Sequence, residues 1–391
     1  MARVLIAGCG YLGAALGRRL AGADLSGTDL SGTGHEVWGL RRGPSGADSS
    51  GAGVSGADPS GAGAPESFLS ETNPSEVGLS KTNLSETNLS DAGLSGSEFT
   101  ENFAPFIADL CDPESLEDLP PDLDFVFYTA AADEAAETAY RSAYLTGLEN
   151  TLDALSNQNQ NLKRFFFASS TAVYAQSAGE WVDEDSPAEA AHFRGRIMRE
   201  AEEMALGGPY PATVVRFGGI YGPGRTRLIE EARRWSLETP RRTLEAAGPV
   251  ETGDGPSGEA GPYVNRIHRE DCAGVFHHLM GMSAPASLYL GVDREPAGKC
   301  EVLRWLGEQL PPGRAAPEEP VPEGAGASDH GDIPPIPDGP QEAAAISDDR
   351  DFRLGGRGKR CSSARLRSAG YTFIHPTFRE GYGAILAGEG G

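Results

Sequence analysis

The chain opens on a run of apolar residues that ends in glycines. Residues 3–7 read RVLIA, the pattern of a short strand buried on both faces, and GCGYLG and then the helix-forming AALGRRL follow. This order predicts a phosphate-binding turn, in which Gly8 makes the tight turn, Gly10 admits a pyrophosphate and Gly13 lets the helix pack closely. Tyr11 and Leu12 belong to the same predicted site, at the helix N-terminus, where free N–H groups favour phosphate. A glycine-rich turn without a ligand is the alternative.

Strand and helix patterns alternate through much of the rest of the chain. Apolar residues at helical spacing predict a helix over residues 139–155. Alternating strands and helices predict an α/β protein with a Rossmann-type doubly wound parallel sheet. The further strands are expected within residues 34–42, 106–110, 124–132, 162–174 and 210–224.

A long tract from residue 43 to 103 interrupts this pattern. From Ala47 it falls into a register of five residues, and a shorter copy, ADLSGTDLSG, occupies residues 23–32. The unit resembles the pentapeptide repeat, but several copies carry Val, Pro, Ala or Ser at the central position that a β-helix fills with Leu. Because Gly, Ser and Pro leave little to bury, we predict a pentapeptide-like low-complexity insertion. A short β-helix is the alternative.

The distribution of charge and the spacing of the cysteines limit which classes of ligand and partner the chain is expected to bind. The net charge is −24, but residues 43–103 hold nine acids against one lysine, and residues 311–351 hold ten acids against two arginines. The acidity therefore says little about a substrate, and the absence of a basic face argues against nucleic acid. The five cysteines are scattered without metal-ligand spacing, and no apolar segment is long enough to span a membrane. We expect a soluble, cytoplasmic protein without a metal site or membrane partner.

Seven motifs in order resemble one family, the extended, atypical short-chain dehydrogenase/reductases, or NAD(P)-dependent epimerase/dehydratase-like proteins. The resemblance covers nearly everything outside residues 21–34, 43–103 and 311–357. It implies NAD(P) as cofactor, and a small C-terminal substrate lobe that begins near residue 216. The motifs are GCGYLG (8–13), ADL (108–110), TAAA (129–132), SSTAVY (169–174), RFGGIYGPGR (216–225), NRIHRED (265–271) and KRCSSARLRSAGY (359–371).

The predicted domain boundaries follow from these observations. Residues 1–42 and 104–310 would form the NAD(P)-binding Rossmann domain, with the lobe growing out of its last third. Residues 43–103 would be the insertion and residues 311–357 an acidic, Pro/Gly-rich linker. Residues 358–391 would be a C-terminal helical segment of the substrate lobe.

Further cofactor contacts are predicted at three strand ends. Asp109 can accept from an adenine amino group with Leu110 against the ring. Arg41 and Arg42 close the second strand, where an acid would bind the ribose 2′-OH and an arginine a 2′-phosphate. This favours NADP, with NAD as the alternative. In the competing interpretation, the two arginines are only exposed to solvent at a strand end and bind no ligand. The small residues expected beside the nicotinamide ribose are Thr129, Ala130 and Ala131.

The catalytic residues of the family are only partly present. Ser170 matches the hydroxyl that holds the substrate's reacting oxygen, with a turn-capping serine as the alternative. The family's proton donor, a Tyr in YxxxK, has no counterpart in residues 190–204; the alignment places Arg194 and Met198 at its two positions. His192, at i, i+4 spacing from Arg196, is the candidate substitute acid. The positions of Arg216, Tyr221 and His268 suit the substrate lobe or a purely structural role.

These residues predict an NAD(P)-binding oxidoreductase or epimerase/dehydratase acting on a small or nucleotide-linked substrate without the Tyr–Lys pair. A non-catalytic NADP-binding sensor or scaffold is the alternative, and an interaction arm formed by the pentapeptide-like tract is a third reading. The substrate, the reaction direction and the oligomeric state do not follow from the motifs.

Overall fold

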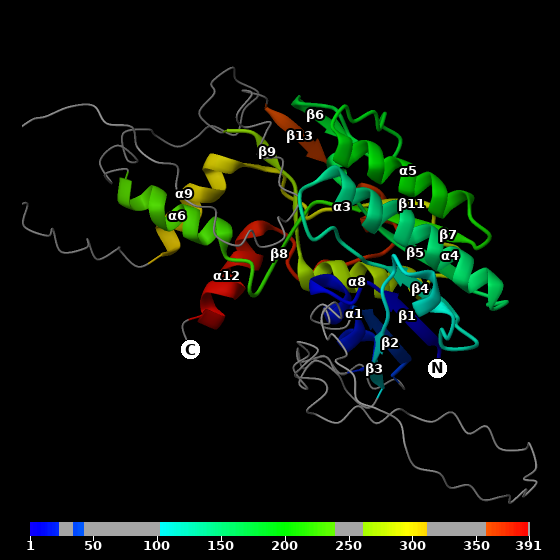
Figure 1. Ribbon diagram of the computed structural model, residues 1–391. Helices are drawn as coiled ribbons and strands as arrows, with labels where there is room; N and C mark the ends of the chain where they lie inside the picture. Colours follow the sequence, from blue (N-terminus) through cyan, green and yellow to red (C-terminus); the bar gives the residue numbers. More distant parts are fainter. Residues whose placement is uncertain (23–33, 43–101, 239–260, 311–356, 390–391) are drawn as a thin grey trace, which may run out of the picture. The chain divides into compact units, whose positions relative to one another are not determined.

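The computed structural model describes residues 1–22, 34–42, 102–238, 261–310 and 357–389 (Figure 1). Within these residues the centre is a seven-stranded parallel sheet with the strand order β11-β7-β5-β4-β1-β2-β3. The order reverses beside β1, as in a doubly wound sheet, so the predicted Rossmann-type fold is confirmed. The strands are β1 (Arg3–Ala7), β2 (Glu36–Arg41), β3 (Phe103–Ile107), β4 (Phe125–Tyr128), β5 (Arg164–Ser170), β7 (Ala212–Phe217) and β11 (Leu288–Gly291).

Consecutive apolar residues in the strands build a core on each face of the sheet. In β5, Phe165 and Phe167 lie in one cluster and Phe166 lies in the other, because successive side chains of a strand point to opposite faces. Phe166 stacks on Phe127 of β4 with ring centroids 4.6 Å apart. Burial of each ring stabilises the fold by roughly 1.5–3 kcal/mol.

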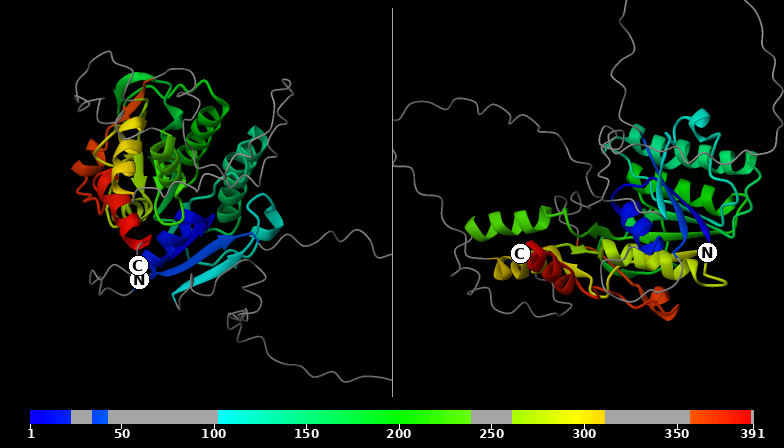
Figure 2. Two further views of the ribbon diagram at one scale, coloured as in Figure 1. Left: turned by 90° about the vertical axis from the view of Figure 1, so that its left-hand side faces the viewer. Right: turned by 90° about the horizontal axis from the view of Figure 1, so that it is seen from below.

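Helices cover both faces, and the right-hand view of Figure 2 shows the two layers. The predicted helix over residues 139–155 is present as one continuous helical stretch in which residues 142–146 form a π-helical turn, η3. Its expected apolar positions, including Tyr140, Tyr144 and Leu148, are buried. One layer consists of α3 (Glu137–Arg141), η3 (Ser142–Thr146), α4 (Gly147–Asn157) and α5 (Phe193–Gly207), and the other of α1 (Tyr11–Leu20) and α8 (Arg269–Met280).

A third core joins helices from the C-terminal part of the chain. Its buried members include Ile229, Leu306 and Phe378, from three helices that lie together in Figure 1. These helices are α6 (Arg227–Glu238), α9 (Lys299–Gln309) and α12 (Phe378–Glu389). Three two-stranded sheets accompany them: β8 (Gly219–Tyr221) with β10 (Arg266–His268), β9 (Tyr263–Val264) with β12 (Ala297–Gly298), and β6 (Ala178–Val182) with β13 (Gly358–Cys361).

Several boundaries differ from the sequence-based prediction. β3 begins at Phe103 rather than Phe106, because the Phe103 ring fills space left by two glycines; a Cβ on Gly17 would lie 2.1 Å from it. The chain also returns to the main sheet after residue 216, since β11 pairs with β7. Residues 358–391 begin with the strand β13 rather than with a helix. The predicted insertion and acidic linker lie almost entirely outside the described residues.

Candidate functional site

The glycine turn after β1 is closed on one side and open on the other. Gly8 has φ +88°, and a Cβ there would lie 2.3 Å from the Ala130 backbone. A Cβ on Gly13 would lie 2.9 Å from the Thr129 hydroxyl oxygen. At Gly10, by contrast, no described atom lies within 4 Å of the Cβ position. Two glycines therefore let the turn pack, and the third leaves room for a ligand to approach the backbone.

The helix that follows offers unpaired donors at this opening. Gly10 is the N-cap of α1, and the first i→i−4 bond runs from the Ala14 N–H to the Gly10 carbonyl, so the N–H groups of Tyr11, Leu12 and Gly13 have no partner inside the helix. The first turn of α1 itself carries no acidic residue. Free N–H groups and the positive end of the helix dipole suit a phosphate, so these residues fit a dinucleotide.

The predicted contacts at the ends of β2 and β3 lie next to each other. Arg41 is the last residue of β2 and its carbonyl accepts from the Ala108 N–H at 3.0 Å. Arg42 follows and is exposed. Asp109 Oδ1 accepts from the Cys111 N–H at 2.9 Å, so part of this carboxylate already shapes its own turn. Leu110, whose carbonyl accepts from Asn150, is half-buried.

The end of β4 contacts the glycine turn directly. The Thr129 hydroxyl donates to the Gly8 carbonyl at 2.9 Å, and the Thr129 N–H donates to the Ala7 carbonyl at 2.8 Å. Ala130 and Ala131 come next, half-buried and exposed respectively. The structure therefore brings these three residues together with the glycine motif, at the carboxyl edge of the sheet where open α/β sheets bind ligands.

Ser170 lies on the same edge, at the end of β5. Phe167 is the last residue of β5 that pairs with β4, where its partner is Tyr128, and Ser170 lies three residues further along β5. Its side chain is 4% exposed, and Oγ accepts from the Ala172 N–H at 3.1 Å, which caps the turn η4 (Thr171–Val173). The capping alternative is thus realised, yet the bond uses only an acceptor lone pair and leaves the hydroxyl hydrogen able to donate.

The segment that should carry the proton donor has a different arrangement from the predicted one. α5 begins at Phe193, and His192 is its N-cap rather than a helical residue sharing a face with Arg196. His192 Nδ1 accepts from the Arg194 N–H at 3.4 Å, so this nitrogen carries no proton in that bond. The difference arises because a His at the helix boundary can satisfy a free backbone donor.

Neither of the two substituted positions resembles a phenol–ammonium pair. Met198 is 1% exposed and packs in the core between the sheet and α5. The Arg194 guanidinium lies over the rings of Tyr140 and Phe193 at 5.6 and 5.8 Å, and its buried Nε has no hydrogen-bond partner among the described residues. The α5 helix still approaches the serine turn, since a Cβ on Gly195 would lie 2.3 Å from the Ala172 carbonyl oxygen.

The residues left open between substrate and structural roles are buried and have partners within the fold. Arg216 donates from Nε and Nη2 to Glu202 at 2.7 and 2.6 Å. His268 caps α8 by accepting from the Glu270 N–H at 3.3 Å, and burial lowers its pKa to about 3. Tyr221 stacks on Tyr382 with ring centroids 4.4 Å apart. The partners of Arg216 and His268 support the structural reading for these two residues, whereas the buried Tyr221 hydroxyl has no hydrogen-bond partner among the described residues.

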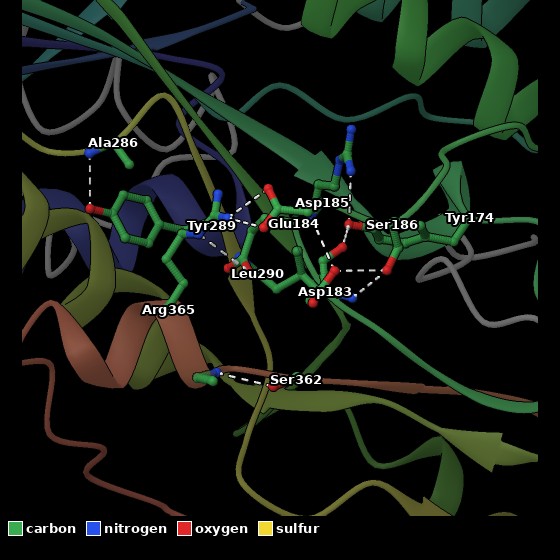
Figure 3. A network of polar contacts seen from close by, with 12 residues as sticks. Tyr174, Asp183, Glu184, Asp185, Ser186, Ala286, Tyr289, Leu290, Ser362 and Arg365 are labelled. Atoms are coloured by element: carbon green, nitrogen blue, oxygen red, sulfur yellow. Dashed lines mark hydrogen bonds and ion pairs between the residues drawn. The ribbon is translucent and has the colours of Figure 1, made fainter.

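A polar network ties the C-terminal segment to the sheet (Figure 3). Arg365 of α11 (Ala364–Ser368) donates from Nη2 to both carboxylate oxygens of Asp185 at 2.8 Å, and its Nε lies 3.6 Å from Glu184. Glu184 in turn accepts from the Leu290 N–H of β11 at 2.8 Å, and burial raises the pKa of this carboxyl. Residues distant in the chain thus hold the loop after β6 in place.

One cluster beside the glycine turn escaped the sequence-based prediction. The guanidinium carbons of Arg225 and Arg269 lie 3.9 and 4.8 Å from the centre of the Tyr11 ring. All three residues stand in motifs that the sequence displays, but more than two hundred positions separate Tyr11 from the arginines. No local pattern indicates such a contact.

The sheet order and the glycine turn define a Rossmann-type α/β protein. The model of the NAD dependent epimerase/dehydratase family matches residues 4–255, and the chain belongs to this family. Among curated proteins, no sequence matches it.

Solved structures agree with this assignment. A Methylobacillus flagellatus protein, provisionally described as an NAD-dependent epimerase/dehydratase, is 30% identical over 100% of both chains with a TM-score of 0.58. Human epimerase family protein SDR39U1 (isoform 2) with NADPH is 16% identical over 98% of this chain and 99% of its own, with a TM-score of 0.54. The UDP-glucose 4-epimerase of Thermus thermophilus with NAD is 15% identical over 97% of this chain and 96% of its own, also with a TM-score of 0.54. The last two show the fold alone.

No helix within the described ranges combines the length and the apolar composition that crossing a bilayer requires.

Proposed function

We propose that the chain binds NADP in preference to NAD and acts as an oxidoreductase or epimerase/dehydratase on a small or nucleotide-linked substrate. The observation that carries the proposal is the glycine turn, with Gly8 and Gly13 packed against the residues that follow β4 and Gly10 open beside the free N–H groups of α1. The preference for NADP rests on Arg41, the last residue of β2, and on Arg42, which follows it, because no acid stands at this strand end.

Ser170 is the residue proposed to act on the substrate. When bound, the nicotinamide cofactor supplies hydride chemistry. The Ser170 Oγ is oriented by the Ala172 N–H, and its O–H can donate to a substrate oxygen that gains negative charge. A positioned donor in a largely buried site stabilises such charge more than water does.

The missing pair limits the rate in this proposal. A positioned acid or base contributes roughly 10²–10⁴-fold to proton-transfer chemistry, and Arg194 and Met198 supply neither. The Nδ1 of His192 already accepts from the Arg194 N–H, so this nitrogen is engaged in capping α5. We therefore propose slow turnover that relies on oxygen positioning by Ser170 and on the proximity of cofactor and substrate.

A non-catalytic NADP-binding sensor or scaffold is the second candidate. The observation that favours it is the burial of Met198, because an apolar core position cannot present an ammonium group to a neighbouring phenol. On this alternative, Ser170 has only its capping role and the glycine turn still binds the dinucleotide.

Cofactor titration followed by a turnover screen tests both candidates. NADPH should bind the full chain more tightly than NADH, and the double variant Arg41→Asp, Arg42→Ala should reverse the order. Turnover is then measured with sugar nucleotides and simple carbonyl compounds. NADPH binding without any turnover would favour the sensor, and absence of binding to either dinucleotide would contradict both candidates.

A further inference from the structure

The ring of Tyr11 is flanked by two guanidinium groups from distant parts of the chain. Arg225 lies in the turn after β8, with its guanidinium carbon 3.9 Å from the ring centre, and Arg269, the first residue of α8, lies at 4.8 Å. The Tyr11 hydroxyl donates to the Pro223 carbonyl at 3.0 Å, and Arg225 Nη1 donates to the Ile220 carbonyl at 3.1 Å. These contacts hold the ring and the turn together.

The charges in this cluster do not balance. Arg269 pairs with Glu270, whose Oε1 lies 3.0 Å from Nη2 and 3.1 Å from Nε. Arg225 has no carboxylate within ion-pair distance among the described residues, although it is half-buried. Burial is the main cause that lowers the pKa of Arg225, and the nearby charge of Arg269 adds to it. An anion placed between the two groups would relieve this cost.

The position of the cluster indicates which kind of anion it would meet. Tyr11 is the first residue of α1, directly after the open position of Gly10. The arginines therefore lie at the edge of the turn whose free N–H groups suit a pyrophosphate. A planar guanidinium donates two parallel hydrogen bonds to phosphate oxygens, and the contact with the Tyr11 ring restricts where each guanidinium can lie.

We infer that Arg225 and Arg269 together bind a phosphoryl group beside the glycine turn. The inference rests on the proposed function, because it places this group at the same edge of the sheet as the cofactor. The group belongs either to a phosphorylated or nucleotide-linked substrate or to the pyrophosphate of the cofactor itself, and the experiment separates these two sources.

The probe is inorganic pyrophosphate, titrated calorimetrically into the full chain alone and into the chain saturated with NADPH. Arg225→Gln and Arg269→Gln should each weaken pyrophosphate binding about tenfold or more, since a hydrogen bond to a charged group contributes on that scale. Arg227→Gln is the matched control, because Arg227 is exposed and only two positions beyond Arg225. It should change the affinity by less than about twofold. Thermal unfolding confirms that each variant is folded.

The two titrations assign the source. Arginine-dependent binding to the NADPH-saturated protein indicates a substrate phosphate. Binding only to the cofactor-free protein, together with weaker NADPH binding in both variants, indicates the cofactor pyrophosphate. If one Gln variant does not fold, Arg→Lys at that position replaces it, because lysine keeps the charge but loses the two-pronged donor. It should bind the probe several-fold more weakly.

The inference fails if wild type does not bind pyrophosphate in either state, or if the variants bind it as wild type does. Its failure differs from that of the proposed function. A wild-type protein that does not bind NADPH contradicts the proposed function, yet arginine-dependent pyrophosphate binding in that protein would still support the phosphoryl site.

Discussion

Arg216 of β7 and Glu202 of α5 form a buried ion pair with two hydrogen bonds, at 2.7 and 2.6 Å, directly behind the serine turn. Glu202 also accepts from the Ser169 hydroxyl at 2.6 Å, and Arg216 donates to the Tyr174 hydroxyl at 2.8 Å. Three elements therefore meet at this pair: the end of β5, the helix α5 and the strand β7. The pair fixes the helix that carries Arg194 relative to the strand that carries Ser170.

Removing one partner of this pair should strongly destabilise the fold. Glu202→Ala leaves the Arg216 charge buried and unpaired, and we expect the free energy of unfolding to fall by about 3–5 kcal/mol. The measurement is denaturant unfolding of the full chain. Glu203→Ala is the control, because Glu203 is exposed and its ion pair within the described part of the chain is with Arg199, so its loss should cost less than about 1 kcal/mol. Equal effects of the two variants would contradict the structural role of the pair.

Two neighbouring glycines should respond differently to the same substitution. Gly8→Ala forces a Cβ onto Ala130 and keeps φ at +88°, so we expect both weaker NADPH binding and a Tm lower by at least about 4 °C. Gly10→Ala meets no described atom within 4 Å, and its Tm should change by less than about 2 °C.

NADPH affinity should nevertheless fall about tenfold or more in Gly10→Ala, because the added methyl occupies the approach to the turn. Equilibrium titration with NADPH, combined with a thermal scan, measures both quantities on each variant. A Gly10→Ala protein with wild-type affinity would show that the backbone at this turn does not bind the pyrophosphate.

Asp293 should make the stability depend on pH. It is 2% exposed, Oδ1 accepts from the Glu295 N–H at 3.0 Å, and Oδ2 has no hydrogen-bond partner among the described residues. Burial raises its pKa from the ordinary 3.8 to about 8. Between these values the folded protein keeps a proton that the unfolded chain releases, so this group destabilises the fold as the pH rises through the window. Above the folded-state pKa, this loss of folding stability is complete.

Asp293→Asn removes this titration while keeping the side-chain shape. As the pH rises from about 5 to about 9, we expect the Tm of wild type to fall relative to that of Asp293→Asn. At the upper end, the free energy of unfolding of wild type should have fallen by on the order of a few kcal/mol relative to the variant. The comparison cancels other groups, including His268, whose lowered pKa destabilises the fold as the pH falls. Parallel Tm curves for the two proteins would show that Asp293 is not held protonated.

Local signals predicted the central sheet and the place of the glycine turn correctly, whereas phosphate binding at that turn stays a prediction. Gly8, Gly10 and Gly13 lie within six positions, directly after a strand, and each requirement of the turn can be assigned to one of them. The order of apolar segments likewise predicted a parallel sheet, because parallel strands need a crossover connection between them. The role of Ser170 and the cofactor preference stay predictions.

Contacts between distant residues could not be predicted in this way. The start of β3 depends on Phe103 filling the space beside Gly17 and Gly39, which only the folded sheet brings together. The structural role of Arg216 likewise required knowing that α5 places Glu202 behind β7. His192 was assigned to the helix because a spacing of four residues fits a helical face, whereas the backbone begins its helix one residue later.

If the protein turns over a substrate, Ser170 should contribute more than His192. Ser170 ends a buried strand on the edge that the glycine turn and Thr129 share, so its hydroxyl can stabilise an oxygen that gains charge. His192 instead uses Nδ1 to cap α5, where it accepts from the Arg194 N–H. We expect Ser170→Ala to lower kcat by on the order of 10²-fold and His192→Ala by less than about tenfold. The substitution Ser170→Thr, which keeps the hydroxyl, should restore part of the activity, and Tm values compare the folded state of all three variants. The reverse ranking, with His192→Ala the slower enzyme, would mean that the histidine has replaced the missing tyrosine as the proton donor.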